Sequence, residues 1–133
     1  MLPDNLTREE IETVFQHDRF ATVAAGCRVV SGERGRAVCD MELTDVHRNA
    51  MGNVMGGAIF TLADFALAIA CNIGEEPTVS VDHAISFLRS TNGTKLTATA
   101  ACDKPGRHVA FYTVTVEDDM GKTIARMTAT CYR

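Results

Sequence analysis

The sequence predicts an α+β domain in which an antiparallel sheet wraps around one long central helix. One stretch, residues 56–73, is apolar on nearly every side, as expected of a helix buried in a core. Six other stretches alternate apolar and polar residues, which is typical of strands with one buried face. Short turns separate the later strands, so neighbouring strands are expected to run antiparallel, with the apolar helix covering their buried face.

Length and composition indicate a small globular protein. The chain has 133 residues, of which 46% are hydrophobic, enough for the core of a single domain spanning residues 1–133. The net charge is −4 and Lys and Arg do not cluster, which argues against nucleic acid or a membrane surface as a partner. The five cysteines are scattered and include no Cys-x-x-Cys pair. They are expected to be buried thiols in a reducing compartment, so a cytoplasmic location is the default.

The chain is expected to begin with a short helix and two strands. Thr7-Arg8-Glu9-Glu10 is a capping box, followed by apolar residues at helical spacing, which predicts a helix to about His17. A first strand is expected over residues 22–31, with a turn at 32–35. The inward side chains of the second strand are expected to be Ala37, Cys39, Met41 and Leu43.

The loop 44–55 leads into the long helix, which Gly74 is expected to end. Four further strands are expected after it. Their alternating faces are Val79-Val81-His83-Ile85-Phe87, Leu96-Ala98-Ala100-Cys102, Ala110-Tyr112-Val114-Val116 and Ala125-Met127-Ala129-Cys131.

One carboxylate, Asp64, lies in the middle of the apolar helix. It falls on a single stripe that carries every polar side chain of the helix. An unpaired carboxylate in a core is destabilising, so catalysis is one explanation for its presence. The alternative is structural: Asp64 pairs with a backbone group or with Asn72, and glycines serve tight helix packing. The stripe consists of Gly57, Thr61, Asp64, Ala68 and Asn72.

Two glycines, Gly56 and Gly57, begin the same helix. The backbone N–H groups of a first helical turn have no partner within the helix, which makes this end a donor site for an oxyanion. Free amides and a carboxylate along one narrow polar stripe would suit acyl transfer. The pattern alone leaves the catalytic and structural explanations open.

The remaining polar residues give weaker signals. The four histidines have no metal-ligand spacing, so a metal site is not expected. Asp82 and His83 are neighbours on a strand and point to opposite faces, which argues against a dyad. The basic turn Lys104–His108 is either an ordinary solvated hairpin or a contact for a phosphorylated ligand.

Several of these motifs occur together and in order. They are the loop Asn49–Gly57, the helix segment Leu62-Ala63-Asp64, and the segments Val79–Asp82, Phe87-Leu88-Arg89, Gly106–Phe111 and Asp119–Ala125. In this combination the chain resembles the hotdog-fold thioesterases, in the branch of the phenylacetic-acid-degradation thioesterase and human thioesterase superfamily member 2. One position departs from the family pattern: Met55 stands where the Asn-x-x-Gly-x-x-His-Gly-Gly loop has its His.

The resemblance implies a hotdog fold and a hydrolase of acyl- or aryl-CoA thioesters, in class EC 3.1.2. It assigns Asp64 as nucleophile or general base, the Gly57 amide as the group that polarises the carbonyl, and Asn49 as the residue that orients the water or the carbonyl. No metal or cofactor is implied beyond the coenzyme A of the substrate. The substrate contacts it implies are Met55, Gly56, Ser80, Val81, Arg89, Arg107 and His108.

The resemblance also implies a homo-oligomer whose site lies between two subunits, with Asp64 from one and the Asn49–Gly57 loop from the other. A dimer is expected, and pairing of dimers into a tetramer. The alternative from another functional class is a non-catalytic acyl-CoA-binding protein, a sensor or carrier. The presence of Asp64, whose evident use is chemical, argues against that alternative.

Overall fold

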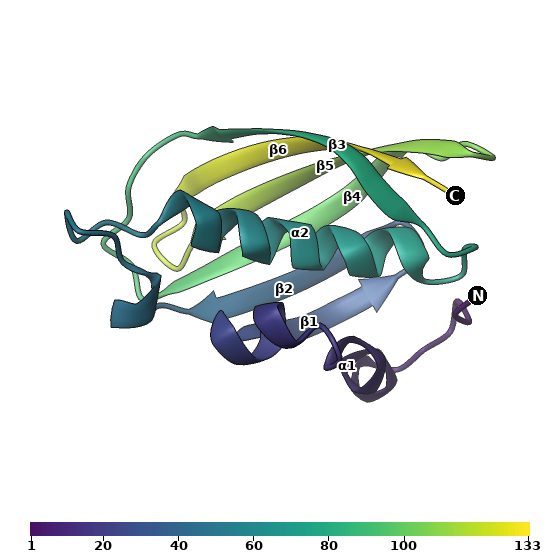
Figure 1. Ribbon diagram of the computed structural model, residues 1–133, viewed down its shortest axis with the longest axis horizontal. Helices are drawn as coiled ribbons and strands as arrows, with labels where there is room; N and C mark the ends of the chain where they lie inside the picture. The colour runs from purple at the N-terminus through teal and green to yellow at the C-terminus, as the bar shows by residue number, and fades with distance from the viewer.

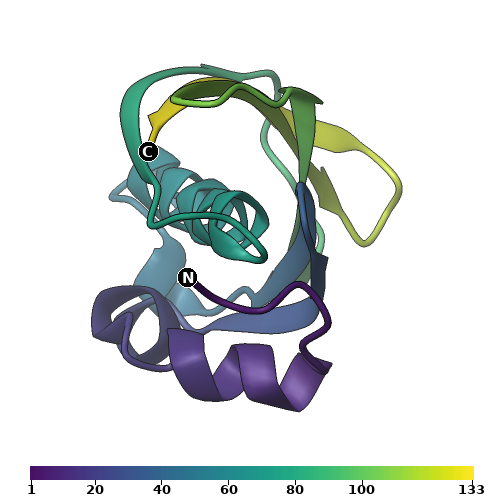
Figure 2. The same ribbon diagram turned by 90° about the vertical axis from the view of Figure 1, so that its right-hand side faces the viewer.

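The apolar stretch folds as helix α2 (Gly56–Asn72), which lies along the hollow of one curved six-stranded sheet (Figure 1). The computed structural model describes residues 1–133. Seen along the helix, the sheet curls around α2 (Figure 2). The predicted α+β architecture, an antiparallel sheet wrapped around one long helix, is therefore confirmed.

All strand pairs are antiparallel, and the strand order is β1-β2-β4-β5-β6-β3. Strands β3 and β4 are consecutive in the chain but not neighbours in the sheet, because the segment that connects them passes from the edge of the sheet to its middle. Strands β1 and β3 form the two edges. The strands are β1 (Cys27–Glu33), β2 (Arg36–Glu42), β3 (Val79–Phe87), β4 (Lys95–Lys104), β5 (Val109–Asp118) and β6 (Thr123–Tyr132).

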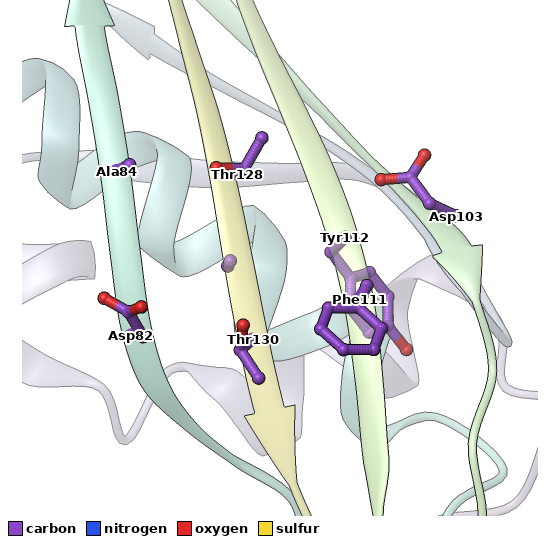
Figure 3. Close-up of a pocket in the computed structure, with 8 residues that line it drawn as sticks. Asp82, Ala84, Asp103, Phe111, Tyr112, Thr128 and Thr130 are labelled. Atoms are coloured by element: carbon purple, nitrogen blue, oxygen red, sulfur yellow. The ribbon is translucent and has the colours of Figure 1, made fainter.

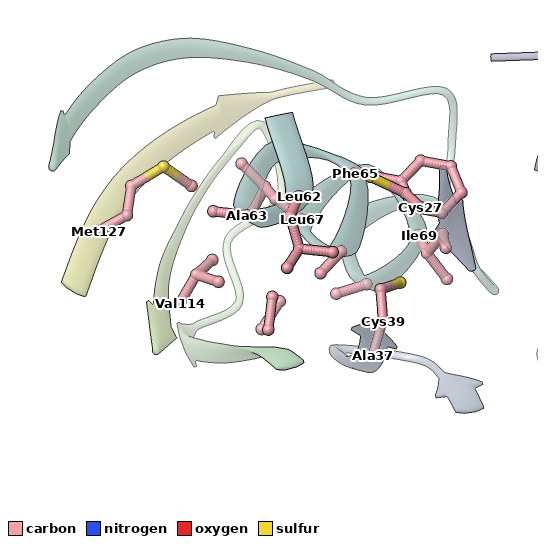
Figure 4. Packing of buried hydrophobic residues seen from close by; sticks show 14 of the residues in the cluster. Cys27, Ala37, Cys39, Leu62, Ala63, Phe65, Leu67, Ile69, Val114 and Met127 are labelled. Atoms are coloured by element: carbon pink, nitrogen blue, oxygen red, sulfur yellow. The ribbon is translucent and has the colours of Figure 1, made fainter. Parts of the chain in front are cut away.

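Helix α2 and the inner face of the sheet share one core (Figure 4). Leu62, Ile69 and Met127 are among its fully buried side chains. The inward residues predicted for β2, β4, β5 and β6 are buried, except that Leu43 and Cys102 are only partly covered. After α2, Gly74 adopts a φ of +69°, a left-handed conformation that favours glycine and turns the chain away from the helix. None of the helices combines the length and apolar character needed to cross a bilayer.

The N-terminal region departs from the prediction at one place. The capping box forms as expected and begins helix α1 (Arg8–Phe15), which packs on β1. The strand predicted over residues 22–31 begins only at Cys27, because residues 20–24 form a π-helical turn, η1 (Phe20–Ala24). The Thr22 hydroxyl donates to the Asp18 carbonyl at 3.0 Å, which favours a helical backbone over an extended one.

The predicted alternation of β3 is also wrong at its start. A β-bulge falls between Ser80 and Asp82, so Val81 is an extra residue without a partner on β6. Val79 and Val81 are consequently 62% and 61% exposed. Beyond the bulge His83 and Ile85 face the helix, as the alternation predicts, but Ser80 shares their face instead of the two valines.

Candidate functional site

The N-terminus of α2 carries free backbone donors. The N–H groups of Gly56 and Gly57 have no acceptor in the chain, and Met55 at the N-cap position supplies no side-chain hydrogen bond. A Cβ at Gly56 would meet the Phe87 ring at 3.0 Å, so any larger residue there must displace that ring. A Cβ at Gly57 would meet nothing nearer than the Met55 Cε at 3.8 Å. Glycine at 57 therefore leaves open space above a free amide, which is what an oxyanion donor needs.

Asp64 lies two turns further along α2. Its side chain is 47% exposed and accepts no hydrogen bond within the chain. The expectation of a carboxylate enclosed in the core is therefore wrong for the single chain, because the polar stripe is the least covered side of α2. Partial burial raises the pKa of Asp64, and His83 opposes that rise.

The structural alternative for Asp64 is not supported. The carboxamide of Asn72 is used elsewhere: its Oδ1 accepts the Thr78 N–H at 2.9 Å, and its Nδ2 donates to the Thr78 carbonyl at 3.1 Å. These bonds tie the end of α2 to the segment before β3. Thr61, also on the stripe, donates its hydroxyl to the Gly57 carbonyl at 2.8 Å. Asp64 is thus the one stripe side chain with an unused polar group.

His83 is the site residue that sequence reasoning missed. Its ring faces α2, and its Nε2 lies 3.7 Å from the Asp64 Oδ1. The ring is packed against Phe60 with ring centroids 5.0 Å apart. Asp82 lies on the opposite, outer face, where it lines a depression of about 260 Å³ with Phe111 and Thr130 (Figure 3). The prediction that Asp82 and His83 do not form a dyad therefore agrees with the geometry, while the partner of His83 is Asp64.

The loop before α2 is held by its own hydrogen bonds. The Asn49 Oδ1 accepts the N–H groups of Met51 at 3.0 Å and Asn53 at 3.1 Å. Its Nδ2 has no partner in the chain, so the free polar group of Asn49 is a donor. Asn49 can therefore donate to a carbonyl or to the oxygen of a water, but its acceptor is already engaged.

His47 anchors this loop to the body of the protein. The ring is buried, and its Nδ1 accepts the Thr44 N–H at 3.0 Å. The neutral ring therefore carries its proton on Nε2, which donates to the Ala25 carbonyl at 2.6 Å. The His47 carbonyl accepts the Met55 N–H at 2.7 Å, directly before Gly56. His47 thus connects the turn after η1 to the start of α2.

Two grooves beside η1 border the stripe. One has a volume of about 340 Å³ and is lined by Asp64, Thr61 and Phe20, among others. The other, about 400 Å³, is mostly apolar and is lined by Met55, Gly57 and the same Phe20 and Thr61. Met55 is 56% exposed and lies on the wall of the second groove. A small acyl group has room next to either the carboxylate or the free amides.

The other predicted contact residues lie at two separate ends of the sheet (Figure 1). Arg89 lines a hollow with Gly56 near the start of α2. Arg107 and His108 lie in the exposed β4–β5 turn, beside the last strand residue, Tyr132, and far from the start of α2. Ser80 faces inward, and Val81 is the exposed bulge residue. A single chain does not bring all the predicted contacts together.

The catalytic candidates are also apart within one chain. Gly57 and Asp64 are seven residues apart on α2, which is about 10 Å along a helix at 1.5 Å per residue. An oxyanion donor and a base must each reach the reacting group at about 3 Å. The amide and the carboxylate of one helix are therefore far apart for groups that would act on one carbonyl.

Comparison with known proteins identifies close similarities. Residues 51–125 match the family model of the Thioesterase superfamily. The chain is 32% identical over 123 residues to human acyl-coenzyme A thioesterase 13, covering 90% of this chain and 88% of that protein. It is also 32% identical over 118 residues to Escherichia coli acyl-coenzyme A thioesterase PaaI, covering 88% of this chain and 84% of that one.

Solved structures agree with the sequence comparison. The E. coli PaaI structure superposes with a TM-score of 0.83 at 28% identity and covers 96% of both chains. A Streptococcus mutans protein solved with acetyl-CoA bound has a TM-score of 0.74 at 28% identity, over 78% of this chain and 85% of that chain. These similarities confirm the predicted hotdog fold.

Proposed function

We propose, from the premise that the chain belongs to the thioesterase superfamily, that it hydrolyses acyl-CoA thioesters to a free acid and coenzyme A. The observation that carries the proposal is an accessible carboxylate without a hydrogen-bond partner, on a helix whose N-terminal amides are free. The names of the relatives support the acyl-CoA substrate, as does the acetyl-CoA bound in the S. mutans structure.

In the proposed reaction Asp64 is the group that activates the attack. As a general base it takes a proton from water while the water oxygen bonds to the thioester carbon; as a nucleophile its own oxygen forms that bond and water then hydrolyses the acyl-enzyme. The Gly57 amide, helped by the dipole of α2, stabilises the charge that develops on the carbonyl oxygen. The C–S bond then breaks, and the thiolate leaves and takes up a proton. Because a thioester is already activated, the reaction requires no metal or bound cofactor.

We propose that two subunits form each site. The separation of Gly57 and Asp64 by about 10 Å along one helix supports this, because two subunits can place the amide of one helix and the carboxylate of the other on opposite sides of one carbonyl. Strand β3 is an exposed sheet edge with four exposed apolar side chains on and just after it, and edges of this kind favour pairing with another chain. The pairing of such dimers into a tetramer rests on the family resemblance alone. The exposed apolar residues are Val79, Val81, Phe87 and Leu88.

The remaining assignments follow from this arrangement. We propose that Asn49 donates to the carbonyl or to the attacking water through its free Nδ2. Arg107 and His108 are proposed to contact the phosphates of coenzyme A, since both are exposed on a turn that is separate from the catalytic groups. The five cysteines are free, which is compatible with a reducing compartment, and we expect a cytoplasmic location.

The decisive experiment measures thiol release from a panel of acyl- and aryl-CoA substrates. We expect turnover by the wild-type protein and a loss of about 100-fold or more in kcat for Asp64→Asn. Asp82→Asn, which changes a carboxylate on the outer face, is the matched control and should retain its kcat. Tight binding of acyl-CoA without turnover of any substrate would instead identify the sensor or carrier. A near-normal kcat for Asp64→Asn would remove Asp64 from the mechanism.

A further inference from the structure

We infer that His83 is a positioning residue that acts through Asp64 and keeps its carboxylate ionised. The inference rests on the proposed function, because it assigns His83 to the hydrolysis carried out by Asp64. It concerns a residue on β3, across the site from α2, whose ring lies on the inner face of the sheet and reaches the carboxylate.

Both ring nitrogens of His83 face acceptor atoms. Nε2 lies 3.7 Å from the Asp64 Oδ1, and Nδ1 lies 3.4 Å from the Met127 sulfur. A carboxylate and a thioether can only accept hydrogen bonds, and the thioether accepts weakly. The His83 side chain is only 16% exposed, so water can contact little of the ring.

Other titratable groups near Asp64 and His83 also affect the pKa of the Asp64 carboxylate. Asp18 and Arg19 line the same groove as Asp64 from the segment before η1. Asp18 raises the pKa of Asp64, as burial does more strongly, and His83 is the group that lowers it. Cys131 on β6 also lies within electrostatic range of Asp64. On this account the His83 ring offsets the effect of burial and of Asp18 on the carboxylate.

This role predicts an effect confined to acid pH. Carboxylates titrate near pH 4, where an ordinary histidine is charged. A positive charge at about 4 Å lowers the pKa of a carboxylate by about one to three units, and the exposure of Asp64 favours the lower end. Without His83, the pH at which activity falls on the acid side should therefore rise. Well above pH 6 the carboxylate is ionised with or without the imidazole, so the difference should vanish.

The test compares pH profiles of kcat and KM for the wild type, His83→Gln and the matched control His17→Gln, whose side chain is exposed after α1. We expect the acid limb of the His83→Gln profile to move up by about one pH unit, which lowers kcat by up to about tenfold on that limb. At pH 8 kcat should be within about twofold of wild type, with KM unchanged at both pH values. An unmoved acid limb, or an equal loss of kcat at all pH values, would overturn the inference.

A second readout is independent of turnover. Carbon NMR of the Asp64 carboxyl group should show a titration midpoint about one pH unit higher in His83→Gln than in wild type. An unchanged midpoint would disprove the role of His83 even in an active enzyme. If the wild type hydrolyses no acyl-CoA, the proposed function fails and with it the link to hydrolysis. Should the Gln variant not fold, His83→Met provides the same comparison, since Met is apolar enough for this inward position.

Discussion

Replacing His47 should weaken both the fold and the catalytic site, because this ring holds three parts of the chain together. It accepts from the Thr44 N–H, donates to the Ala25 carbonyl, and precedes the loop whose last residue, Met55, donates to the His47 carbonyl. Gly56 and Gly57 follow directly, so a shift of this anchor moves the free amides of α2. We expect substitutions of His47 to lower kcat as well as the free energy of unfolding.

The size of the stability effect depends on which hydrogen bond is lost. Ala25 is buried, so its carbonyl would remain unsatisfied without His47, at a cost of about 1–3 kcal/mol. Thr44 is exposed, and water can replace the ring as acceptor of its N–H. His47→Ala should therefore lower the free energy of unfolding by about 3 kcal/mol, with part of the loss from the cavity left by the ring.

Two substitutions, each able to replace one of the two ring hydrogen bonds of His47, separate their contributions to stability. The Nε2 of Gln can donate to the Ala25 carbonyl, whereas the Oδ1 of Asn imitates only the acceptor Nδ1. The structure thus predicts that His47→Gln is more stable than His47→Asn, and that both exceed His47→Ala. Urea unfolding measures the order, with the exposed His17→Asn as a control expected to change stability by less than about 0.5 kcal/mol. The reverse order of Gln and Asn, or an Ala variant as stable as wild type, would show that the Ala25 hydrogen bond does not anchor this loop.

Three further predictions use other parts of the structure. Co-refolding Asp64→Ala with Asn49→Ala at equal concentration should restore up to about a quarter of wild-type activity, since each mixed two-fold dimer has one intact site; no recovery despite heterodimers detected by mass spectrometry would place the site within one subunit. Arg107→Ala should raise KM for acyl-CoA by about three- to tenfold at low salt and less at high salt, because ions screen an exposed contact. An unchanged KM at low salt would argue against a contact between Arg107 and coenzyme A. Asp118 accepts the Thr91 hydroxyl at 2.6 Å and the Lys122 N–H at 2.8 Å, which lowers its pKa. Its stabilising effect is therefore present at neutral pH and lost on acidification, so Asp118→Asn should be destabilised at pH 7 in urea unfolding and approach wild type below about pH 4; equal stability at pH 7 would contradict this.

Much of the secondary structure was predictable because it depends on local patterns. The capping box at Thr7 and the two-residue alternation of β2, β4, β5 and β6 are properties of short segments, and the structure has both. Residues 22–31 were mispredicted for the opposite reason. Their apolar, β-branched composition favours a strand, but the hydrogen bond of Thr22 and the contact of Ala25 with His47 hold the chain in a turn until Cys27.

Some features of the candidate site were likewise predictable from local patterns, and others were not. Helical periodicity alone placed Asp64 and Gly57 on one stripe, and the free amides follow from the position of the glycines at a helix start. The alternation of β3 placed His83 on the same face as Ile85, but its approach to Asp64 was not predictable, because it depends on how β3 lies relative to α2. The structure was also needed to show that Asn49 can act only as a donor, because two backbone N–H groups already occupy its Oδ1.

Local sequence patterns predict the kinds of element, the apolar character of α2 and the residues on its polar stripe, because periodicity and composition act over a few neighbouring residues. The pairing of β3 with β6 at an exposed edge, and the half-exposed position of Asp64 beside His83, arise instead from the packing of the whole chain. Strand order, register and bulges depend on contacts between residues that are far apart in the chain. The sequence of one segment does not contain this information, so the neighbours of its side chains are set only when the whole sheet closes around the helix.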